Sequence, residues 1–319
     1  MPQEIITTTE MTEKRPSIVW GKDQNLLVWT GIDYVINISS SPMDTFNFKS
    51  SPTKFKTYKD PTLVMFPTGD SGYLFWTGTI KTDDGYQILY AEVKRDANGK
   101  LVLDDRSTEL TSAISLDGII AATLTTQNGQ LVINLAWRNQ HKHVCLTQVQ
   151  PWKKVMSSWS QTQLDQKANA GPALATIGGR PIMVYFDDNK HLNIVLAPKN
   201  TINFDLHNKV IFKDISSNYA PSIVVQSVGI GYVFWVGASD AKLNYHQIGM
   251  DARGEVVMNT QVEGSGVIKD AIAVAAPSAR MVARQTDGQH AALLQVVWTQ
   301  SGSRYIKIAE FEPHYTALT

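Results

Sequence analysis

The sequence is poor in several features that define common protein classes. Its single cysteine, Cys145, cannot form a disulfide within the chain, so packing alone must hold the fold. The 29 basic and 29 acidic residues give a formal net charge of zero. This balance argues against a nucleic-acid partner, because such binding requires a basic surface that replaces counterions. No apolar run approaches the ~18 residues of a membrane span, so we expect no membrane insertion.

The N-terminus lacks the features of a secretion signal. Residues 1–10 contain neither a basic segment nor the apolar core of a signal peptide. We therefore expect a cytoplasmic protein, with release by a non-classical route as the alternative.

Motifs for metals and cofactors are missing as well. The sequence has no glycine-rich phosphate loop, nucleophile elbow or zinc signature. His141 and His143 could project from one side of an extended segment, but few further ligands lie at a suitable spacing. This pattern favours an ordinary hairpin, and we expect no metal and no cofactor.

What the sequence does contain is a repeated unit made of short strands, with almost no helical signal. Each unit has an apolar strand that ends in an aromatic residue, a short polar turn and a second apolar strand. Six such aromatic anchors recur: Trp29, Trp76, Trp137, Tyr185, Trp235 and Trp298. Strand-only repeats of about 40–60 residues are typical of a β-propeller. We therefore predict an all-β fold, a six-bladed β-propeller that forms a single domain over residues 1–319.

A proline or a small residue marks the start of the innermost strand of each unit. Four units carry a proline there: Pro16, Pro61, Pro172 and Pro221. Proline is tolerated at the first residue of a strand because its missing N–H lies outside the ladder. For the third and sixth units, we expect the innermost strands at 117–121 and 270–274, where a small residue replaces proline.

Similar units recur half a chain apart. The turn at 96–99, Asp-Ala-Asn-Gly, returns at 251–254 as Asp-Ala-Arg-Gly, a hairpin signal between apolar runs. This pairing predicts two three-blade halves. The last unit ends after its third strand, and the β-prone residues 4–9 can supply the missing outermost strand. We predict that this N-terminal strand closes blade six and protects the sheet edge.

Antiparallel order within a blade predicts which loops share a face. The turn between strands two and three lies on the same face as the linker to the next blade, and such loops often carry binding residues. Polar and aromatic side chains in these loops suit hydroxylated ligands. We select these ligand-binding candidates: Asp33, Tyr58, Asp60, Asp84, Arg138, Asp187, Asp188, Tyr219 and Asp240. The same linkers also carry Lys14, Arg15, Lys59 and Asp117.

These positions also have structural interpretations. The aromatic anchors are expected to pack between blades, because an aromatic residue in every repeat usually belongs to the core. An aspartate in a short turn often accepts hydrogen bonds from its own backbone. We expect Cys145 to be a buried, small apolar residue.

The repeated unit resembles the repeats of bacterial lectin-like and sialidase-like β-propellers. The resemblance rests on Pro-x-Leu/Ile-Val, on a strand that ends in Trp-Thr-Gly-x-Asp, as at 29–33, and on Leu-Asn-Ile, as at 192–194. It spans essentially the whole chain and implies a sugar-binding propeller, with sites between blades in six-bladed lectins. Sialidases carry Asp boxes of the form Ser-x-Asp-x-Gly-x-Thr-Trp, and the nearest stretch, 41–46, lacks the glycine.

The favoured function is therefore a lectin-like protein that binds a glycan or another small molecule, and an oligomer remains compatible with it. The polar loop residues differ from unit to unit, which favours one asymmetric site over six. This leaves an enzyme open, a glycoside hydrolase or cyclase with one pocket at the axial mouth. Its catalytic groups would be Asp187, Asp240, Arg138 and His141. A protein-interaction scaffold or toxin component is the third alternative.

Overall fold

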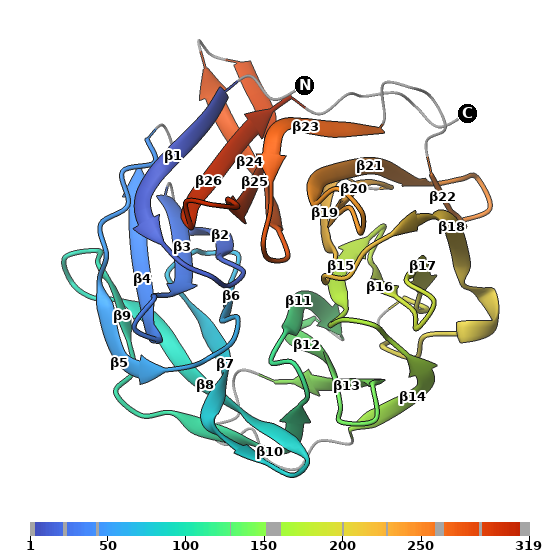
Figure 1. The fold of residues 1–319 in the computed structure, drawn as a ribbon, viewed down its shortest axis with the longest axis horizontal. Helices are drawn as coiled ribbons and strands as arrows, with labels where there is room; N and C mark the ends of the chain where they lie inside the picture. Colours follow the sequence, from blue (N-terminus) through green and yellow to red (C-terminus); the bar gives the residue numbers. More distant parts are fainter. Residues whose placement is uncertain are drawn as a thin grey trace.

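The computed structural model describes residues 4–21, 24–42, 45–127, 129–150, 161–199, 201–227, 229–258, 265–286 and 289–312. These residues form six antiparallel sheets that are arranged around a common axis (Figure 1). The predicted six-bladed β-propeller is confirmed. The one helix in the described ranges is a single 3₁₀ turn, η1 (Leu206–Asn208), and no described helix is long and apolar enough to cross a membrane.

Blades one to three follow the order expected from the repeats, with the innermost strand first. Blade one contains β2 (Ser17–Gly21), β3 (Gln24–Thr30), β4 (Val35–Pro42) and β5 (Pro52–Lys56). Blade two contains β6 (Thr62–Met65), β7 (Ser71–Thr82), β8 (Gly85–Arg95) and β10 (Thr108–Ser115), and β9 (Leu101–Leu103) also pairs with β8. Blade three contains β11 (Ile120–Gln127), β12 (Gln130–Arg138), β13 (His143–Val149) and β14 (Thr162–Lys167).

Blades four to six complete the ring. Blade four contains β15 (Ala173–Ile177), β16 (Arg180–Phe186), β17 (His191–Leu196) and β18 (Val210–Ser216). Blade five contains β19 (Ser222–Ser227), β20 (Ile230–Val236) and β21 (Lys242–Met250), and both β22 (Val256–Met258) and β23 (Ser265–Ile272) pair with β21. Blade six contains β24 (Ser278–Thr286), β25 (Gln289–Thr299), β26 (Tyr305–Phe311) and β1 (Glu4–Met11).

The N-terminal strand closes blade six, as predicted. β1 pairs antiparallel with β26, with Ile6 opposite Ile308, and the two strands lie side by side in Figure 1. The Thr8 hydroxyl donates to the Ile306 carbonyl at 3.1 Å. The outer edge of the last blade is thereby covered by the strand at the opposite end of the described chain.

The predicted innermost strand of blade six was wrong. Residues 265–272 form β23, an outer strand of blade five, and the innermost strand of blade six is β24, which follows Pro277. Blade five therefore extends further along the chain than the small residues at 270–274 suggested. A proline precedes the innermost strand in every blade except the third, where β11 begins at Ile120.

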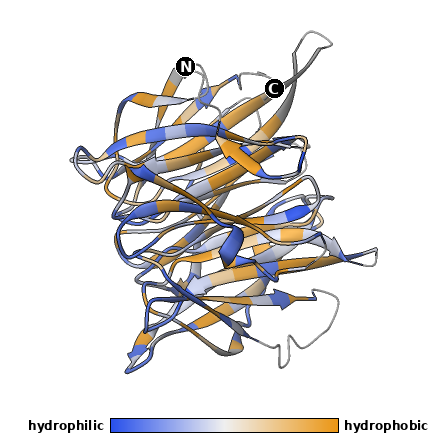
Figure 2. Cartoon of the chain, turned by 90° about the vertical axis from the view of Figure 1, so that its right-hand side faces the viewer, coloured by the Kyte–Doolittle hydropathy of each residue, from blue (hydrophilic) through white to orange (hydrophobic). Residues whose placement is uncertain are grey.

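The six aromatic anchors are buried and pack between blades, which confirms their structural interpretation. Each anchor belongs to a hydrophobic cluster that it shares with the preceding blade. Trp137 packs with Phe75 of blade two, and Trp298 packs with Phe234 of blade five. Figure 2 shows apolar residues along the strands of successive blades. Every junction between blades is thus a piece of the core, and burial of apolar area holds the ring together.

Hydroxyl groups add hydrogen bonds between blades close to the axis. The first residues of β2, β6, β19 and β24 are Ser17, Thr62, Ser222 and Ser278. Each bonds the backbone of a neighbouring innermost strand, for example Leu63 N to Ser17 Oγ at 3.3 Å and Thr62 Oγ1 to the Ile120 carbonyl at 2.6 Å. These bonds satisfy backbone groups that the crowded axis would otherwise leave unpaired.

Candidate binding site on the linker face

The turns between strands two and three and the linkers between blades form one face of the ring, which we call the linker face. All the ligand-binding candidates selected from the sequence lie on it. They divide into a group in the turns and a group in the linkers near the axis, and the two groups have different environments.

The aspartates of the turns shape their own turns. Asp33 Oδ1 accepts from Val35 N at 3.1 Å, and Asp240 Oδ1 accepts from Lys242 N at 3.1 Å. The Asp187 carboxylate accepts three hydrogen bonds: Oδ1 accepts from Asn189 N and His191 N, and Oδ2 accepts from the Asn193 amide. A residue with positive φ precedes the third strand in all three turns: Tyr34, Lys190 and Ala241. These carboxylates therefore hold tight turns together.

Other turn candidates lie at exposed tips. Asp84 is exposed in the turn between β7 and β8, and His141 is exposed in the turn between β12 and β13. Asp188 Oδ1 lies 3.6 Å from Lys142 Nζ. His143 Nδ1 lies 2.9 Å from the Gln163 amide nitrogen. Among the described residues, no group of three or more His, Cys, Asp or Glu side chains could hold a metal ion.

The proposed enzyme residues Asp187, Asp240, Arg138 and His141 do not converge on one point. Asp187 and Asp240 belong to the turns of different blades, and both carboxylates accept hydrogen bonds from their own turns. Residues 168–169 of the next linker accept hydrogen bonds from Arg138, and Ala168 also forms a β-bridge with Asp187. The Arg138 guanidinium therefore does not pair with Asp187.

The linkers do bring charged residues together around the axis. We call this group the axial cluster, and it comprises Lys14, Arg15, Lys59, Asp60, Asp117 and Arg138. Arg15 N donates to Asp60 Oδ1 at 3.1 Å, which joins the linkers on either side of blade one. Arg138 Nη2 lies 2.9 Å from Asp117 Oδ2, while Nη1 donates to the Ala168 carbonyl at 3.0 Å. Arg138 thus connects the linkers on either side of blade three.

Burial changes the acidity of both carboxyl groups in the axial cluster. Burial raises the pKa of Asp60 to about 6, although the Arg15 N–H and the charges of Arg15 and Lys14 oppose this shift. The charge of Asp117 raises the pKa of Asp60 further. Burial also raises the pKa of Asp117, and the Arg138 guanidinium opposes that change. Burial is therefore the main cause of the raised pKa of both carboxyl groups.

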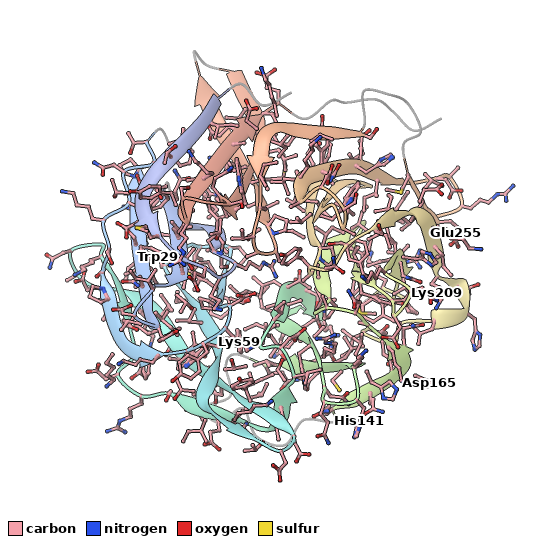
Figure 3. All side chains as sticks on the ribbon, viewed as in Figure 1. Trp29, Lys59, His141, Asp165, Lys209 and Glu255 are labelled. Atoms are coloured by element: carbon pink, nitrogen blue, oxygen red, sulfur yellow. The ribbon has the colours of Figure 1, made fainter. Side chains whose placement is uncertain are left out.

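Aromatic residues flank the charged side of the axis. Lys59 Nζ lies 5.2 Å from the centroid of the Tyr86 ring, a cation–π arrangement. Tyr58 is 42% exposed and contacts Tyr34 edge to face, with the ring centroids 4.7 Å apart. Figure 3 places Lys59 closer to the centre of the ring than His141. Tyr58 therefore presents an accessible ring in the linker that also carries Lys59 and Asp60.

A small apolar cluster lies on the other side of the axis. Ala170, Ala220 and Ala276 form a small buried cluster, against which Ile119 and Tyr219 pack. These alanines come from the linkers that precede blades four, five and six. Linkers with charged residues before blades one to three thus face linkers without charged residues before blades four to six, and the sixfold repetition of the fold is broken on this face.

A narrow cavity lies below the axial cluster. Its volume is about 100 Å³, and the first residues of all six innermost strands line it together with Arg15. Arg15 is the one charged side chain in this described lining, and its buried Nη1 has no hydrogen-bond partner among the described residues. The space suits a few water molecules but is smaller than the ~300 Å³ typical of ligand pockets. A larger ligand would therefore contact the cluster from the linker face.

Sequence reasoning selected Asp60, Arg138 and Tyr219 but left out Arg15, Lys59 and Asp117. A usable signal existed, because Arg15 and Asp60 both stand directly before a proline that opens an innermost strand. The position directly before the proline identifies linker residues near the axis, whereas a position in the turn between strands two and three does not.

The protein is therefore a six-bladed β-propeller, and the linkers on one of its faces form a single charged cluster at the axis. No protein-family model matches the sequence, and no curated protein matches it either. Among solved structures, the chain is similar to AofleA from Arthrobotrys oligospora. The TM-score is 0.64 at 9% identity, over 98% of this chain and 93% of that chain. A triple arginine-to-alanine mutant of AofleA gives 0.67 at 10% identity, over 97% and 86%.

The chain is also similar to a sialidase from Trypanosoma rangeli that was solved in complex with sialic acid. The TM-score is 0.54 at 11% identity, over 95% of this chain but 54% of that chain, so this chain spans about half the sialidase. The resemblance to sialidase-like propellers is thus confirmed for the fold. At such low identities, these similarities show the fold alone.

Proposed function

We propose that this protein is a carbohydrate-binding propeller, lectin-like in function, with one site on the linker face over the axial cluster. The observation that carries this proposal is the broken symmetry of that face. Four cationic and two acidic side chains gather on one side of the axis, and the same linker as Lys59 and Asp60 carries the exposed Tyr58.

This combination suits a sugar for chemical reasons. The Arg15 guanidinium has a free donor, and lysine and aspartate groups can donate to and accept from hydroxyl groups. The Tyr58 ring can cover the apolar face of a sugar ring. The T. rangeli sialidase supports the proposal in a limited way, since its complex with sialic acid shows that a similar fold can host a sugar.

A glycoside hydrolase is the second candidate, and Asp60 favours it. A carboxyl group with a pKa of about 6 could serve as a general acid near neutral pH. We place binding first because Asp60 is only 9% exposed and its Oδ1 already accepts from the Arg15 backbone. A general acid must reach the glycosidic oxygen, and this carboxyl is largely covered.

A glycan array followed by calorimetry on the best ligand tests the proposal. We expect one site on the linker face and a loss of affinity at that site of roughly tenfold or more in Tyr58→Ala, because loss of a stacked ring commonly costs about 1.5 kcal/mol. Trp20→Ala is the matched control: this exposed aromatic lies on β2, away from the linkers.

Equal affinity in Tyr58→Ala and the parent protein would place the site elsewhere. Absence of binding to any glycan would reject the proposal and leave the scaffold alternative. Release of a reducing sugar from the bound ligand, lost in Asp60→Asn, would replace binding with hydrolysis as the function.

A further inference from the structure

A second hollow lies on the opposite face, between blades one and two. Its volume is about 320 Å³, which is within the usual range of ligand pockets. Its lining comes from β4, from the connection at 47–51 and from the turn before β9. The lining residues are Ile38, Ser39, Ser40, Asn47, Lys49, Ser50, Ser51, Lys100 and Leu101. None of the ligand-binding candidates selected from the sequence lines this pocket.

The wall formed by the 47–51 connection is held in place by the core. Phe48 is 2% exposed and packs with Trp29 of blade one and Val297 of blade six. Lys49 N donates to Ser39 Oγ at 3.1 Å, and Ser50 Oγ donates to Asn37 Oδ1 at 2.6 Å. The backbone that carries the lining residues is therefore fixed before any ligand arrives, which lowers the entropic cost of binding.

The opposite wall is fixed by an arginine that crosses the groove between the blades. Arg95 donates to the Gly99 carbonyl of the turn at 2.7 Å, and it also donates to the Gly21 carbonyl and Gln24 Oε1 of blade one. Lys100 N donates to Asp96 Oδ1 at 2.9 Å. The turn that carries Lys100 is thus held against blade one at a defined distance.

The pocket is cationic and rich in hydroxyl groups. Lys49 and Lys100 are the two charged residues of the described lining, and the Glu10 carboxylate outside it accepts from Ser50 N at 3.2 Å. In the described part of the chain, neither lysine forms an ion pair. The hydroxyls of Ser40 and Ser51 and the Asn47 amide bond no other side chain within those same ranges. Two lysines and three residues with free hydrogen-bonding groups thus line the same space.

The corresponding segments of blades four and five carry acidic residues at the two positions that match Lys49 and Lys100. Its connection repeats the same turn: Phe48 N donates to the Phe46 carbonyl at 3.0 Å, and Phe204 N donates to the Ile202 carbonyl at 3.0 Å. The residue after the donor phenylalanine is Lys49 in one half and Asp205 in the other.

The two hairpin turns match in the same way. Asp96 Oδ1 accepts from Lys100 N, and Asp251 Oδ1 accepts from Glu255 N, each at 2.9 Å. Arg180 donates to the Gly254 carbonyl at 2.7 Å, as Arg95 does to Gly99. Two equivalent backbones thus carry two lysines in one half and two carboxylates in the other. Charge is therefore a distinguishing property of the groove between blades one and two.

We propose that the pocket between blades one and two is a second binding site, which takes a saccharide that bears an anionic group. Lys49 and Lys100 bind the phosphate, sulfate or carboxylate group, because charge-assisted hydrogen bonds to such oxygens are the strong ones. Ser40, Ser51 and Asn47 bind the sugar hydroxyls. This site lies on the face opposite the axial cluster and does not depend on it.

Calorimetry with four matched sugars tests this site: glucose 6-phosphate, glucose 6-sulfate, glucuronate and glucose, with inorganic phosphate as a fifth probe. We expect saturable 1:1 binding of at least one anionic sugar, weaker at high salt, and no binding of glucose. The preferred probe identifies the anionic group. Lys49→Gln and Lys100→Glu should each weaken binding by about tenfold or more. Arg15→Lys on the linker face should leave this binding unchanged.

Lys213→Glu is the matched control for Lys100→Glu, because it makes the same charge change at an exposed lysine on β18. Three outcomes would overturn the proposal: no anionic sugar binds, Lys213→Glu weakens binding as much as Lys100→Glu, or glucose binds as well as the anionic sugars. Equal affinity for inorganic phosphate and glucose 6-phosphate would show that the site binds the anionic group and does not recognise the sugar. If the linker face binds no glycan but an anionic sugar still binds here, the proposed function fails and this second site stands.

Discussion

Asp60 shows how a single linker residue links the electrostatics of the axis to the stability of the ring. Burial raises its pKa from the ordinary 3.8 to about 6, so the folded protein binds a proton that the unfolded chain releases over this range. Protonation of Asp60 therefore stabilises the folded state fully below about pH 4. That contribution is lost as the pH rises through about 6.

We predict that Asp60→Asn removes this part of the pH dependence. The free energy of unfolding of the parent protein should fall by about 2–3 kcal/mol relative to Asp60→Asn between pH 4 and pH 7. Urea denaturation of both proteins across this range measures the difference. Parallel stability curves would show that the Asp60 carboxyl titrates at its ordinary value.

Gly118 is a second linker residue with a specific requirement, because its backbone conformation favours glycine. It has a φ of +74°, and a Cβ at this position would lie 2.3 Å from Lys59 Cγ. We expect Gly118→Ala to lower the free energy of unfolding by about 2–4 kcal/mol, through left-handed strain and this contact. Gly99→Ala is the control, since Gly99 has a φ of +75° but no neighbour within 4 Å. It should cost only about 1–2 kcal/mol, and equal losses in denaturation would show that the Lys59 contact is easily relieved.

At the scale of elements, β1 is the strand that closes the ring. Ile6 on this strand packs against the cluster that contains Phe48 and Ile308, whereas Thr9 is exposed. We predict that Ile6→Lys lowers the midpoint of thermal unfolding by several degrees, because a charge enters an apolar junction. Thr9→Lys should leave the midpoint unchanged. Equal midpoints for both variants, measured by circular dichroism, would indicate that β1 adds little to closure.

The elements also show which parts of the fold could be predicted from sequence. The blades were recognised because each aromatic anchor packs on the preceding blade, so the same requirement recurs in every unit. The innermost strand of blade six was misplaced because two neighbouring segments both match the sequence pattern expected for such a strand. Residues 270–274 are small and apolar, but the Pro277-Ser278 pair carries the same signal as Pro16-Ser17 and Pro221-Ser222.

The site was harder to predict because its contacts join distant parts of the chain. Asp187 and Asp240 stood out in the sequence as polar loop residues, but their carboxylates accept hydrogen bonds from their own turns. The bond from Arg15 to Asp60 spans 45 residues, and the proline after each residue indicates a place near the axis but not that the two residues meet. Sequence periodicity locates the linker face, whereas only the folded ring shows which linkers meet at the axis.

At the scale of the whole molecule, a buried polar network ties blade six to blade one. The Arg280 guanidinium on β24 donates to Gln295, to Asn25 and to the Val19 carbonyl. The Gln295 amide then donates to Glu310 on β26. The network therefore spans the junction at which the ring closes.

We predict that Arg280→Met lowers the free energy of unfolding by about 3–5 kcal/mol, because its buried partners are left unsatisfied. Arg253→Met, at an exposed arginine in the turn before β22, is the control and should change little. Guanidinium denaturation compares the two variants. A small loss in Arg280→Met would mean that apolar packing alone secures the junction.

The pairing of β1 with β26 also determines when the ring can close during synthesis of the chain. Thr8 and its partner Ile306 are 298 residues apart. At a synthesis rate of about 5–20 residues per second, β1 leaves the ribosome roughly 15 to 60 s before its partner exists. During that interval the first strand has no sheet to join, while five blades can form behind it. The ring therefore closes as a late event, and β1 must remain unpaired with other chains until then.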